Sequence, residues 1–362
     1  DLVTQKGLTW LKQAADSKKP FMAMVQYKAP HRNWAPAFRH INMFDDVTMP
    51  EPETLFDNYE NRSSVLKEHA MGIQDHMSWG NDMKMQGENL FPSHFTGRGN
   101  GQFNRLTDQD KKTVISAYED ENKQFIKDMR AGKLDQKAIT RWKYQRYIKD
   151  YLAVIQSMDE GIAKILKHLD DSGLAKNTIV IYSADNGYYL GDRGFAGKWS
   201  HYEQSLRVPL IIYDPRQPAK NRGRVVPQTA LNLDFPATFL DWADVDVPAR
   251  YQGRSLVPIV SGNAKLDWRS ESFHEHLAVR TRQAAFEGIR ESRYKYVRYF
   301  DEKPAYEFLH DLKNDPDELI NLANDPSYQD ELIRLRNRCQ QRVVELGGAV
   351  PPLEAAPRSN VK

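Results

Sequence analysis

The chain has 362 residues, a length that favours one large and one small structural unit. Its 40% hydrophobic and 28% charged residues are an ordinary globular composition, and the net charge of +2 predicts binding to neither nucleic acid nor a membrane surface. No apolar run reaches the roughly 18 residues of a membrane-spanning helix, and the first residues carry no signal-peptide pattern. One cysteine excludes an internal disulfide. The composition leaves the oligomeric state open.

The first half of the chain alternates between helical patterns and less regular stretches. Residues 2–15 predict a helix that leads into a strand over residues 21–27. Pro30 holds the preceding residue extended and begins a loop that carries His31. The prolines and polar runs of residues 44–137 predict long surface loops. Apolar residues then recur at helical spacing over residues 144–169, which predicts one long amphipathic helix packed on a sheet.

The second half of the chain contains short strand patterns. Residues 178–183 and 208–213 predict two buried strands, and the turn sequence DNG ends the first. A helix is expected to begin at Asp234. After residue 262 the pattern changes to short strands of an antiparallel sheet, followed by a helix that begins after Asp325. The strand patterns are at residues 272–276, 286–290 and 294–300.

Three polar side chains close to the strand at 178–183 indicate a charged site. Asp185 and Asn186 follow this strand directly, and ligands of open α/β sheets collect beyond the carboxyl ends of strands. Their oxygens suit a divalent cation such as calcium or magnesium, while Lys198 supplies a mobile positive charge for an anionic substrate. An ordinary surface turn is the alternative explanation of DNG alone. Parallel strands would bring His31 to the same sheet edge, so we predict one shared site.

Other reactive residue types carry weaker signals. His274 and His276 are separated by one residue and are expected to alternate on a strand, which does not fit a helical zinc motif. His274 is a candidate for contact with substrate. His201 is a candidate for the rim of the site, with a packing role as the open alternative. Cys339 lies in a charged helical pattern and is not expected to be a nucleophile.

Several segments together resemble a known family. Residues 183–187 (SADNG) and 197–212 (GKWSHYEQSLRVPLII) resemble the second metal-binding segment of type I sulfatases, the formylglycine-dependent branch of the alkaline-phosphatase superfamily. Residues 20–34 are similar to the family's strand and loop that end in an active-site histidine. Segments between residues 288 and 323 resemble its C-terminal subdomain. The family's paired aspartates, Cys-x-Pro-x-Arg motif and Lys-x-His element do not occur in this sequence. We therefore expect a C-terminal two-thirds of a sulfatase, inactive alone.

The resemblance implies an architecture. We expect an alkaline-phosphatase-like α/β domain over residues 1–262, with a mixed, largely parallel central sheet flanked by helices. A smaller subdomain of antiparallel sheet and helix is expected over residues 263–362. A periplasmic or secreted location is also implied.

The resemblance also implies a reaction, the hydrolysis of a sulfated carbohydrate of the N-acetylglucosamine-6-sulfate, mucin or glycosaminoglycan kind. Asp185 and Asn186 would bind Ca²⁺, with Mg²⁺ less favoured, and Lys198 would hold a sulfate oxygen. His31 would donate a hydrogen bond or proton to the leaving alcohol. Formylglycine would come from the missing segment. Two alternatives stay open: a phosphoesterase or phosphonate hydrolase of the same superfamily, and a non-catalytic fragment that binds sulfated glycans.

Overall fold

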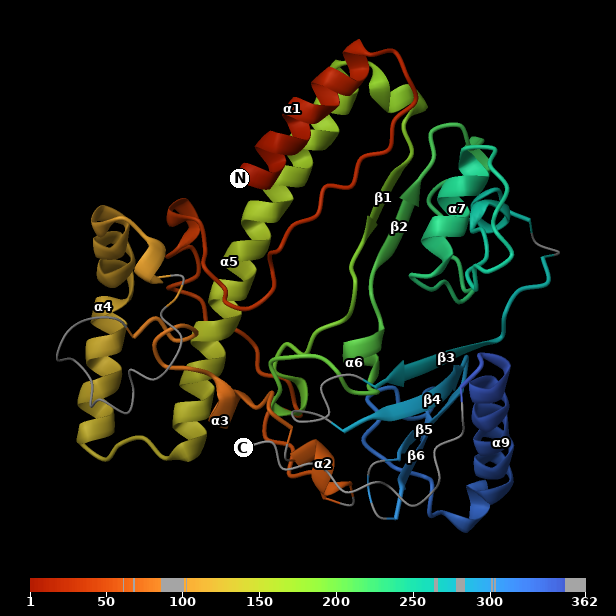
Figure 1. Ribbon diagram of the computed structural model, residues 1–362. Helices are drawn as coiled ribbons and strands as arrows, with labels where there is room; N and C mark the ends of the chain where they lie inside the picture. Colours follow the sequence, from red (N-terminus) through yellow and green to blue (C-terminus); the bar gives the residue numbers. More distant parts are fainter. Residues whose placement is uncertain are drawn as a thin grey trace. The chain divides into compact units, whose positions relative to one another are not determined.

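The computed structural model describes residues 1–348 except 61, 68, 86–100, 102, 264–265, 278–283, 301 and 303. The chain forms two compact units, whose elements carry the labels of Figure 1. The first unit contains residues 1–57, 71–178 and 190–196, and the second contains residues 58–70, 179–189 and 197 onward. The predicted boundary after residue 262 falls inside the second unit, and the proposed division into domains stays a prediction.

The first unit is built on two helices. Helix α1 (Leu2–Asp16) confirms the predicted first helix, and α5 (Gln136–Asp171) confirms the long amphipathic helix but begins earlier. Asp135 explains this start, because its side chain accepts a hydrogen bond from the Ala138 amide at 2.7 Å. Gly161 of α5 allows the two helices to approach closely, since an added Cβ atom would lie 2.4 Å from the Thr4 hydroxyl oxygen.

Residues 44–137 contain a helix that the sequence analysis did not predict. Helix α4 (Asp108–Arg130) begins after Thr107, whose hydroxyl accepts from the Asp110 amide at 3.2 Å. It packs on α5, where the rings of Phe125 and Trp142 stack with centroids 4.2 Å apart. The expected surface loops are therefore partly replaced by a packed helix. Shorter helices of this unit are η1 (Phe38–His40), α3 (Ile73–His76), η3 (Phe103–Arg105), η4 (Leu174–Asn177) and η5 (Asp192–Gly194).

The predicted strand at residues 21–27 is wrong for the described structure. A strand requires a hydrogen-bonded partner, and the described sheets contain no pairing that involves this segment. Its aromatic residues instead pack on α1. Phe21 meets Trp10 edge to face with ring centroids 5.8 Å apart, and the hydroxyl groups of Tyr27 and Thr4 lie 2.8 Å apart.

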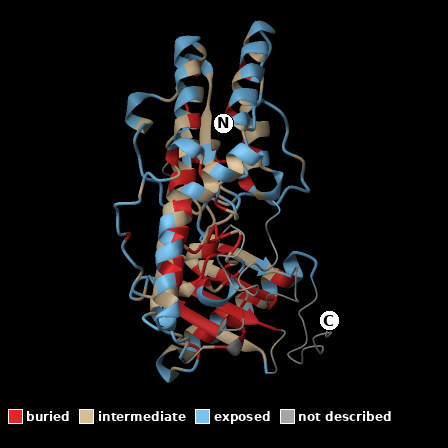
Figure 2. Ribbon diagram, turned by 90° about the vertical axis from the view of Figure 1, so that its left-hand side faces the viewer, coloured by how far each residue is buried: buried red, intermediate tan, exposed pale blue. Residues whose placement is uncertain are grey.

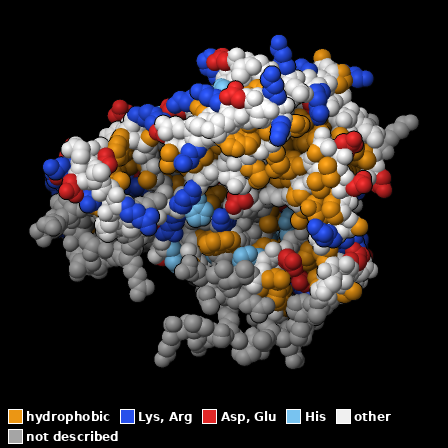
Figure 3. All heavy atoms as spheres, turned by 45° about the horizontal axis from the view of Figure 1, so that its top comes forward, with side chains coloured by type: hydrophobic (Ala, Val, Ile, Leu, Met, Phe, Trp, Pro, Cys, Tyr) orange, Lys and Arg blue, Asp and Glu red, His pale blue; other side chains and the backbone are white. Residues whose placement is uncertain are grey.

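The two strands predicted in the middle of the chain are confirmed as a ribbon in the second unit, but the predicted burial is wrong, because neither strand contains a buried residue. Strand β1 (Val180–Ser183) pairs with β2 (Leu210–Tyr213) in antiparallel register. One face exposes Tyr182, Ile211 and Tyr213 at 43%, 62% and 47% of their surface, and hydrophobic side chains are visible at the surface in Figure 3. All pairs between described strands are antiparallel, so the described residues do not contain the expected largely parallel sheet.

A four-stranded antiparallel sheet and a terminal helix form the core of the second unit. The strands follow in the order β3 (Glu271–His276), β4 (Phe286–Glu291), β5 (Tyr294–Tyr299) and β6 (Tyr306–Asp311), of which β6 was not predicted. Helix α9 (Gln329–Glu345) lies alongside the sheet (Figure 1). Much of this sheet is buried (Figure 2). The core between them is made of Ile289, Tyr296, Leu309, Ala323, Leu332, Leu335 and Cys339. The α/β class with a C-terminal sheet and helix is thereby confirmed.

The remaining helices of the second unit are short. They are α2 (Ser64–Lys67), α6 (Glu203–Leu206), η6 (Ala219–Asn221), α7 (Asp234–Trp242), α8 (Val257–Val260) and η7 (Pro326–Tyr328). The predicted start of a helix at Asp234 is confirmed. Its buried carboxylate fixes the surrounding chain by accepting from the amides of Leu231 and Arg254, each at 2.8 Å. In the described part of the chain, we find no helix with the length and apolar character needed to cross a membrane.

Candidate functional site

The turn after β1 presents two of the predicted site residues. Asp185 is exposed, and its Oδ1 accepts from the Asn186 amide at 3.0 Å. Asn186 is half-buried, and its Nδ2 donates to the Gly187 carbonyl at 2.7 Å. Asn232, which the sequence analysis missed, donates from Nδ2 to the Asp185 carbonyl at 2.9 Å. The backbone and the Asn186 side chain are therefore fixed, while the Asp185 carboxylate faces solvent.

The side chain of Lys198 lies beside this turn. Its Nζ donates to the Asn186 Oδ1 at 2.9 Å, so the ammonium group is held beside the amide. Trp199 has a φ of 84°, a conformation that is rare for a bulky residue. Its amide donates to the Ser205 hydroxyl at 2.9 Å. The structure thus brings Asp185, Asn186 and Lys198 together as one charged cluster within the second unit.

Helix α6 contacts the segments on both sides of this cluster. The Gly187 amide donates to the Ser205 carbonyl at 2.9 Å. A Cβ atom on residue 187 would lie 2.2 Å from the Gln204 carbonyl oxygen, so only glycine permits the approach. The glycine of the DNG sequence therefore serves close packing on α6.

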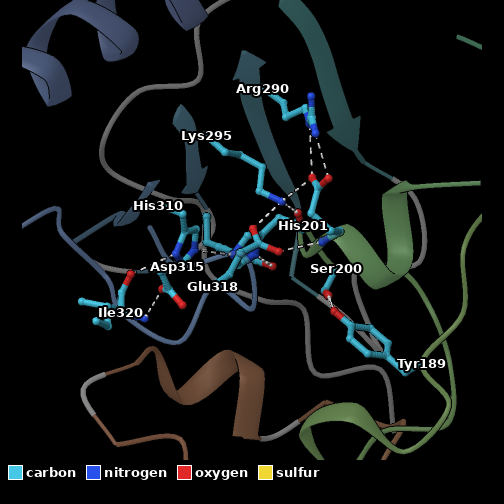
Figure 4. Close-up of polar contacts among 11 residues, drawn as sticks. Tyr189, Ser200, His201, Arg290, Lys295, His310, Asp315, Glu318 and Ile320 are labelled. Carbon is cyan, nitrogen blue, oxygen red and sulfur yellow. Dashed lines mark hydrogen bonds and ion pairs between the residues drawn. The ribbon is translucent and has the colours of Figure 1, made fainter. Parts of the chain in front are cut away.

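His201 is not at an exposed rim. Its side chain is fully buried, with Nδ1 2.9 Å from the Tyr299 hydroxyl and Nε2 3.3 Å from the Nε2 of His310. The His310 Nδ1 lies 3.0 Å from the Ile320 carbonyl, which accepts only, so this nitrogen carries a proton (Figure 4). If both rings are neutral, His310 Nε2 then accepts from His201 Nε2, and the Tyr299 hydroxyl donates to His201 Nδ1. The burial corrects the predicted rim position and favours the packing role.

His274 lies on β3 and alternates with its neighbours as predicted. Its Nε2 is 2.8 Å from the Ser272 hydroxyl. Burial is the largest influence on this imidazole, and together with the charge of Lys295 it lowers the pKa of His274 to about 4. The histidine is therefore neutral at ordinary pH. Contact between His274 and substrate stays a prediction.

His31 lies in an exposed loop of the first unit. Its Nδ1 is 2.8 Å from the Arg32 carbonyl, which accepts only, so Nδ1 carries a proton. In the neutral ring Nε2 is then the acceptor, and in the protonated ring it is a second donor. His31 and the Lys198 cluster belong to different units, and their predicted convergence stays a prediction.

A buried carboxylate that the sequence analysis missed orders the His31 loop. Asp82 has no exposed surface and accepts from Arg32 Nε and Asn33 Nδ2, each at 2.9 Å, and from the Ser78 amide at 2.7 Å. Arg32 also contacts it through Nη2. Burial raises the pKa of Asp82, but the hydrogen bonds and charge of Arg32 outweigh it, so the pKa falls below its ordinary value.

The donor chemistry of the turn fits a hard divalent cation in part. A carboxylate and an amide oxygen at one turn are ligands that calcium prefers, but calcium takes six to eight oxygens. Among the described residues, no group of three or more His, Cys, Asp and Glu side chains is arranged to hold a metal. Asp185 and Asn186 alone could therefore supply only a fraction of such a coordination shell.

Cys339 is a packing residue of α9. It is fully buried in the core against the sheet, and this burial raises the pKa of its thiol to about 12. A thiol that stays protonated is a poor nucleophile, which agrees with the prediction from its helical surroundings.

Comparison with known protein families finds two matches. The family described as sulfatase matches residues 1–245. The family described as the C-terminal part of N-sulphoglucosamine sulphohydrolase matches residues 191–345. Together the two matches cover both units of the chain.

Individual relatives point the same way. The chain is 34% identical over 349 residues to an N-acetylglucosamine-6-O-sulfatase of Bacteroides thetaiotaomicron, covering 94% of this chain and 61% of the relative. It is 29% identical to an arylsulfatase of Clostridium perfringens, covering 92% of this chain and 55% of that one. The chain therefore spans less than two thirds of the length of these relatives.

Solved structures share the fold. One was determined in complex with its substrate D-glucosamine-2-N,6-O-disulfate, and matches with a TM-score of 0.86 and 32% identity over 97% of this chain and 70% of the other. A phosphonate monoester hydrolase from Silicibacter pomeroyi matches with a TM-score of 0.52 and 28% identity over 59% of this chain and 43% of the other.

Proposed function

The chain belongs to the sulfatase family, and from this premise we propose that the protein hydrolyses a sulfate ester of an amino sugar, with N-acetylglucosamine-6-sulfate as the expected type of substrate. The observation that carries the proposal is the similarity of nearly the whole chain to an N-acetylglucosamine-6-O-sulfatase. The match to the structure that holds a glucosamine disulfate supports it. A periplasmic or secreted location is part of the proposal.

In this reaction Lys198 holds a sulfate oxygen. Negative charge increases on the sulfuryl and bridging oxygens in the transition state, so a fixed cation lowers the barrier. The hydrogen bond from Nζ to Asn186 at 2.9 Å supports the role, because it holds the ammonium group in place before substrate binds. An ammonium group held in this way loses less conformational entropy when it meets the sulfate.

His31 acts on the leaving sugar alcohol. An alkoxide is a poor leaving group, so a donor beside the bridging oxygen accelerates its departure. The proton on Nδ1 is fixed by the Arg32 carbonyl, which leaves Nε2 of the protonated ring as the donor. The role requires His31 and Lys198 to reach one substrate.

Asp185 and Asn186 would hold part of the coordination shell of Ca²⁺. Such a cation, when bound, neutralises charge on the sulfate oxygens. The exposed carboxylate of Asp185 and the amide oxygen of Asn186 support this assignment by their chemistry. Formylglycine is the nucleophile in the proposal, and since Cys339 is buried with a raised pKa, we assign it to no residue of this sequence.

A phosphonate or phosphate ester hydrolase is the second candidate, supported by the match to a phosphonate monoester hydrolase. That match covers less of the chain and has a lower TM-score than the match to the structure with the sulfated sugar. We therefore rank the sulfatase first.

The proposal is tested with the protein expressed from its complete gene. We expect release of inorganic sulfate from N-acetylglucosamine-6-sulfate, with a higher kcat/KM than for a phenyl phosphonate ester. A reversed order would favour the second candidate. Binding of the sulfated sugar without any release of sulfate would contradict hydrolysis and favour a non-catalytic glycan-binding protein.

A further inference from the structure

A buried network of charges lies between α6 and the four-stranded sheet. Lys295 of β5 has 1% of its side chain exposed and donates from Nζ to the His201 carbonyl at 2.8 Å and to Glu203 Oε1 at 3.1 Å. It also forms an ion pair with Glu318, whose side chain has no exposed surface. The ammonium group of Lys295 thus has three acceptors, the His201 carbonyl and the carboxylates of Glu203 and Glu318, which matches its three N–H donors. Figure 4 labels Lys295, His201 and Glu318.

Glu203, the first residue of α6, is the centre of the network. Its Oε2 accepts from Arg290 Nη2 at 3.0 Å, and its amide donates to Glu318 Oε2 at 2.7 Å. Burial raises the pKa of Glu203, but the charges and hydrogen bonds of Lys295 and Arg290 outweigh it and bring the pKa to about 2. Two cations and two carboxylates therefore meet in one network, in which Lys295 and Glu318 are buried and Glu203 and Arg290 are half-buried.

The same helix carries the contacts to the candidate site. Ser205 accepts from the Gly187 amide through its carbonyl and from the Trp199 amide through its hydroxyl, each at 2.9 Å. Gly187 follows Asn186, and Trp199 follows Lys198. One short helix thus joins the charge network to the two residues that directly follow Asn186 and Lys198 in the chain.

We propose that Glu203, Lys295 and Glu318 are positioning residues for Lys198 and Asn186, acting through α6. A four-residue helix has little stability of its own, so its placement depends on tertiary contacts. The network supplies contacts to both its first residue and the chain before it. The part of this proposal that concerns catalysis rests on the proposed function, whereas the structural coupling does not.

The coupling is tested by hydrogen exchange in the complete protein. Glu318→Gln and Lys295→Met are expected to speed exchange of the Gly187 and Trp199 amides by at least about tenfold, although neither residue contacts those amides directly. Arg334→Gln is the matched control, since this α9 arginine pairs with Glu291 at 2.6 Å on the solvent side and is 48% exposed. We expect less than about a twofold change there.

A charge-balanced double variant separates positioning from loss of folding. Lys295→Met alone leaves two carboxylates facing one arginine, whereas Lys295→Met with Glu318→Gln removes one charge of each sign. We expect the double variant to exchange more slowly at Gly187 and Trp199 than the single one. Amides of α9, which packs on the sheet in the core of the second unit, serve as the folding control. Unchanged exchange at Gly187 and Trp199 in both single variants would overturn the coupling.

Kinetics then tests the catalytic part. We expect Glu318→Gln to lower kcat on the sulfated sugar by about tenfold with little change in KM, as for a group that acts on the transition state through Lys198. Faster exchange with an unchanged kcat would overturn the positioning role, while wild-type turnover would leave the proposed function intact. Absence of wild-type turnover would reject the proposed function, and the exchange result would still decide the coupling.

Discussion

The His31 loop of the first unit and the Lys198 segment of the second unit are both ordered by buried charge, but in different ways. The His31 loop depends on one carboxylate, Asp82, which binds Arg32 and Asn33 directly beside the histidine. The Lys198 segment depends on several groups that act indirectly. The charge network of Glu203, Lys295 and Glu318 contacts α6, and α6 contacts the turn after β1. A single substitution should therefore disturb the first region more than the second, whose support is shared.

The largest effect is expected from Asp82→Asn. It leaves the Arg32 guanidinium without its buried counter-charge, which costs about 3 to 5 kcal/mol for a buried ion pair. The partial exposure of Arg32, 30% of its side chain, places the expected loss near the lower value. The free energy of unfolding of the first unit, followed by denaturant titration, measures this.

Asp171→Asn is the control for that experiment, because Asp171 forms an exposed pair with Lys167 within one helix. Such a pair contributes about 0.3 to 0.5 kcal/mol. Equal losses in the two variants would show that Asp82 does not hold the loop.

Lys198→Ala tests the second region at the residue that the network supports. Loss of a fixed charge on a transition-state oxyanion lowers kcat by about 10² to 10³. Folding should change little, since the side chain is half-buried and donates one hydrogen bond. The kcat on N-acetylglucosamine-6-sulfate and the unfolding midpoint are measured together, with the exposed Lys220→Ala as the control. A loss of kcat that follows the loss of folded protein would argue against the catalytic role.

How much of these two regions the sequence predicted depends on how far apart in the chain the contacting residues lie. The strand β1 and the helix α5 are encoded by local patterns, and both are found in the predicted part of the chain, although β1 begins two residues later and α5 begins earlier than predicted. Asp82 is 50 residues from Arg32, and Lys295 is 92 residues from Glu203. No periodicity or turn pattern links residues so far apart, so both supports of the site were missed.

The errors have a similar cause. Residues 21–27 have the apolar spacing of a strand, but the same spacing also serves packing on α1, and only a pairing partner decides between the two. His201 was a candidate for the rim of the site because it follows Lys198 by three residues. In the structure the side chain of His201 is buried, where it contacts Tyr299 of β5 and His310 of β6.

His31→Ala should have a smaller and selective effect. We expect kcat/KM on a sulfated sugar to fall about 10²-fold, because the sugar alcohol needs a proton donor, and to fall less than about tenfold on nitrophenyl sulfate. The ratio of the two losses is the measurement, and Asn33→Ala, a change in the same loop, is the control for general disorder. Equal losses on both substrates would deny His31 a role at the leaving group.

Mild acid should weaken the second region before the first. The pKa of His274 is lowered from 6.5 to about 4, chiefly by burial and then by the charge of Lys295. Between pH 4 and pH 6.5 the unfolded chain binds a proton at His274 that the folded chain does not bind. The free energy of unfolding is therefore at its full value above pH 6.5 and decreases as the pH falls below it. At pH 5 the expected loss is about 2 kcal/mol. The pKa of Asp82 is lowered from 3.8, so its contribution is lost only in stronger acid.

Hydrogen exchange at pH 7 and pH 5, corrected for the intrinsic rates, compares the two regions directly. We expect faster exchange at Gly187 and Trp199 at pH 5, with little change in the amides near Asp82. His274→Asn should remove this response because the titrating group is gone, whereas His31→Asn, which removes an exposed histidine, should retain it. A response to acid that persists in His274→Asn would assign the sensitivity to another group, and an equal response in both regions would remove the distinction between them.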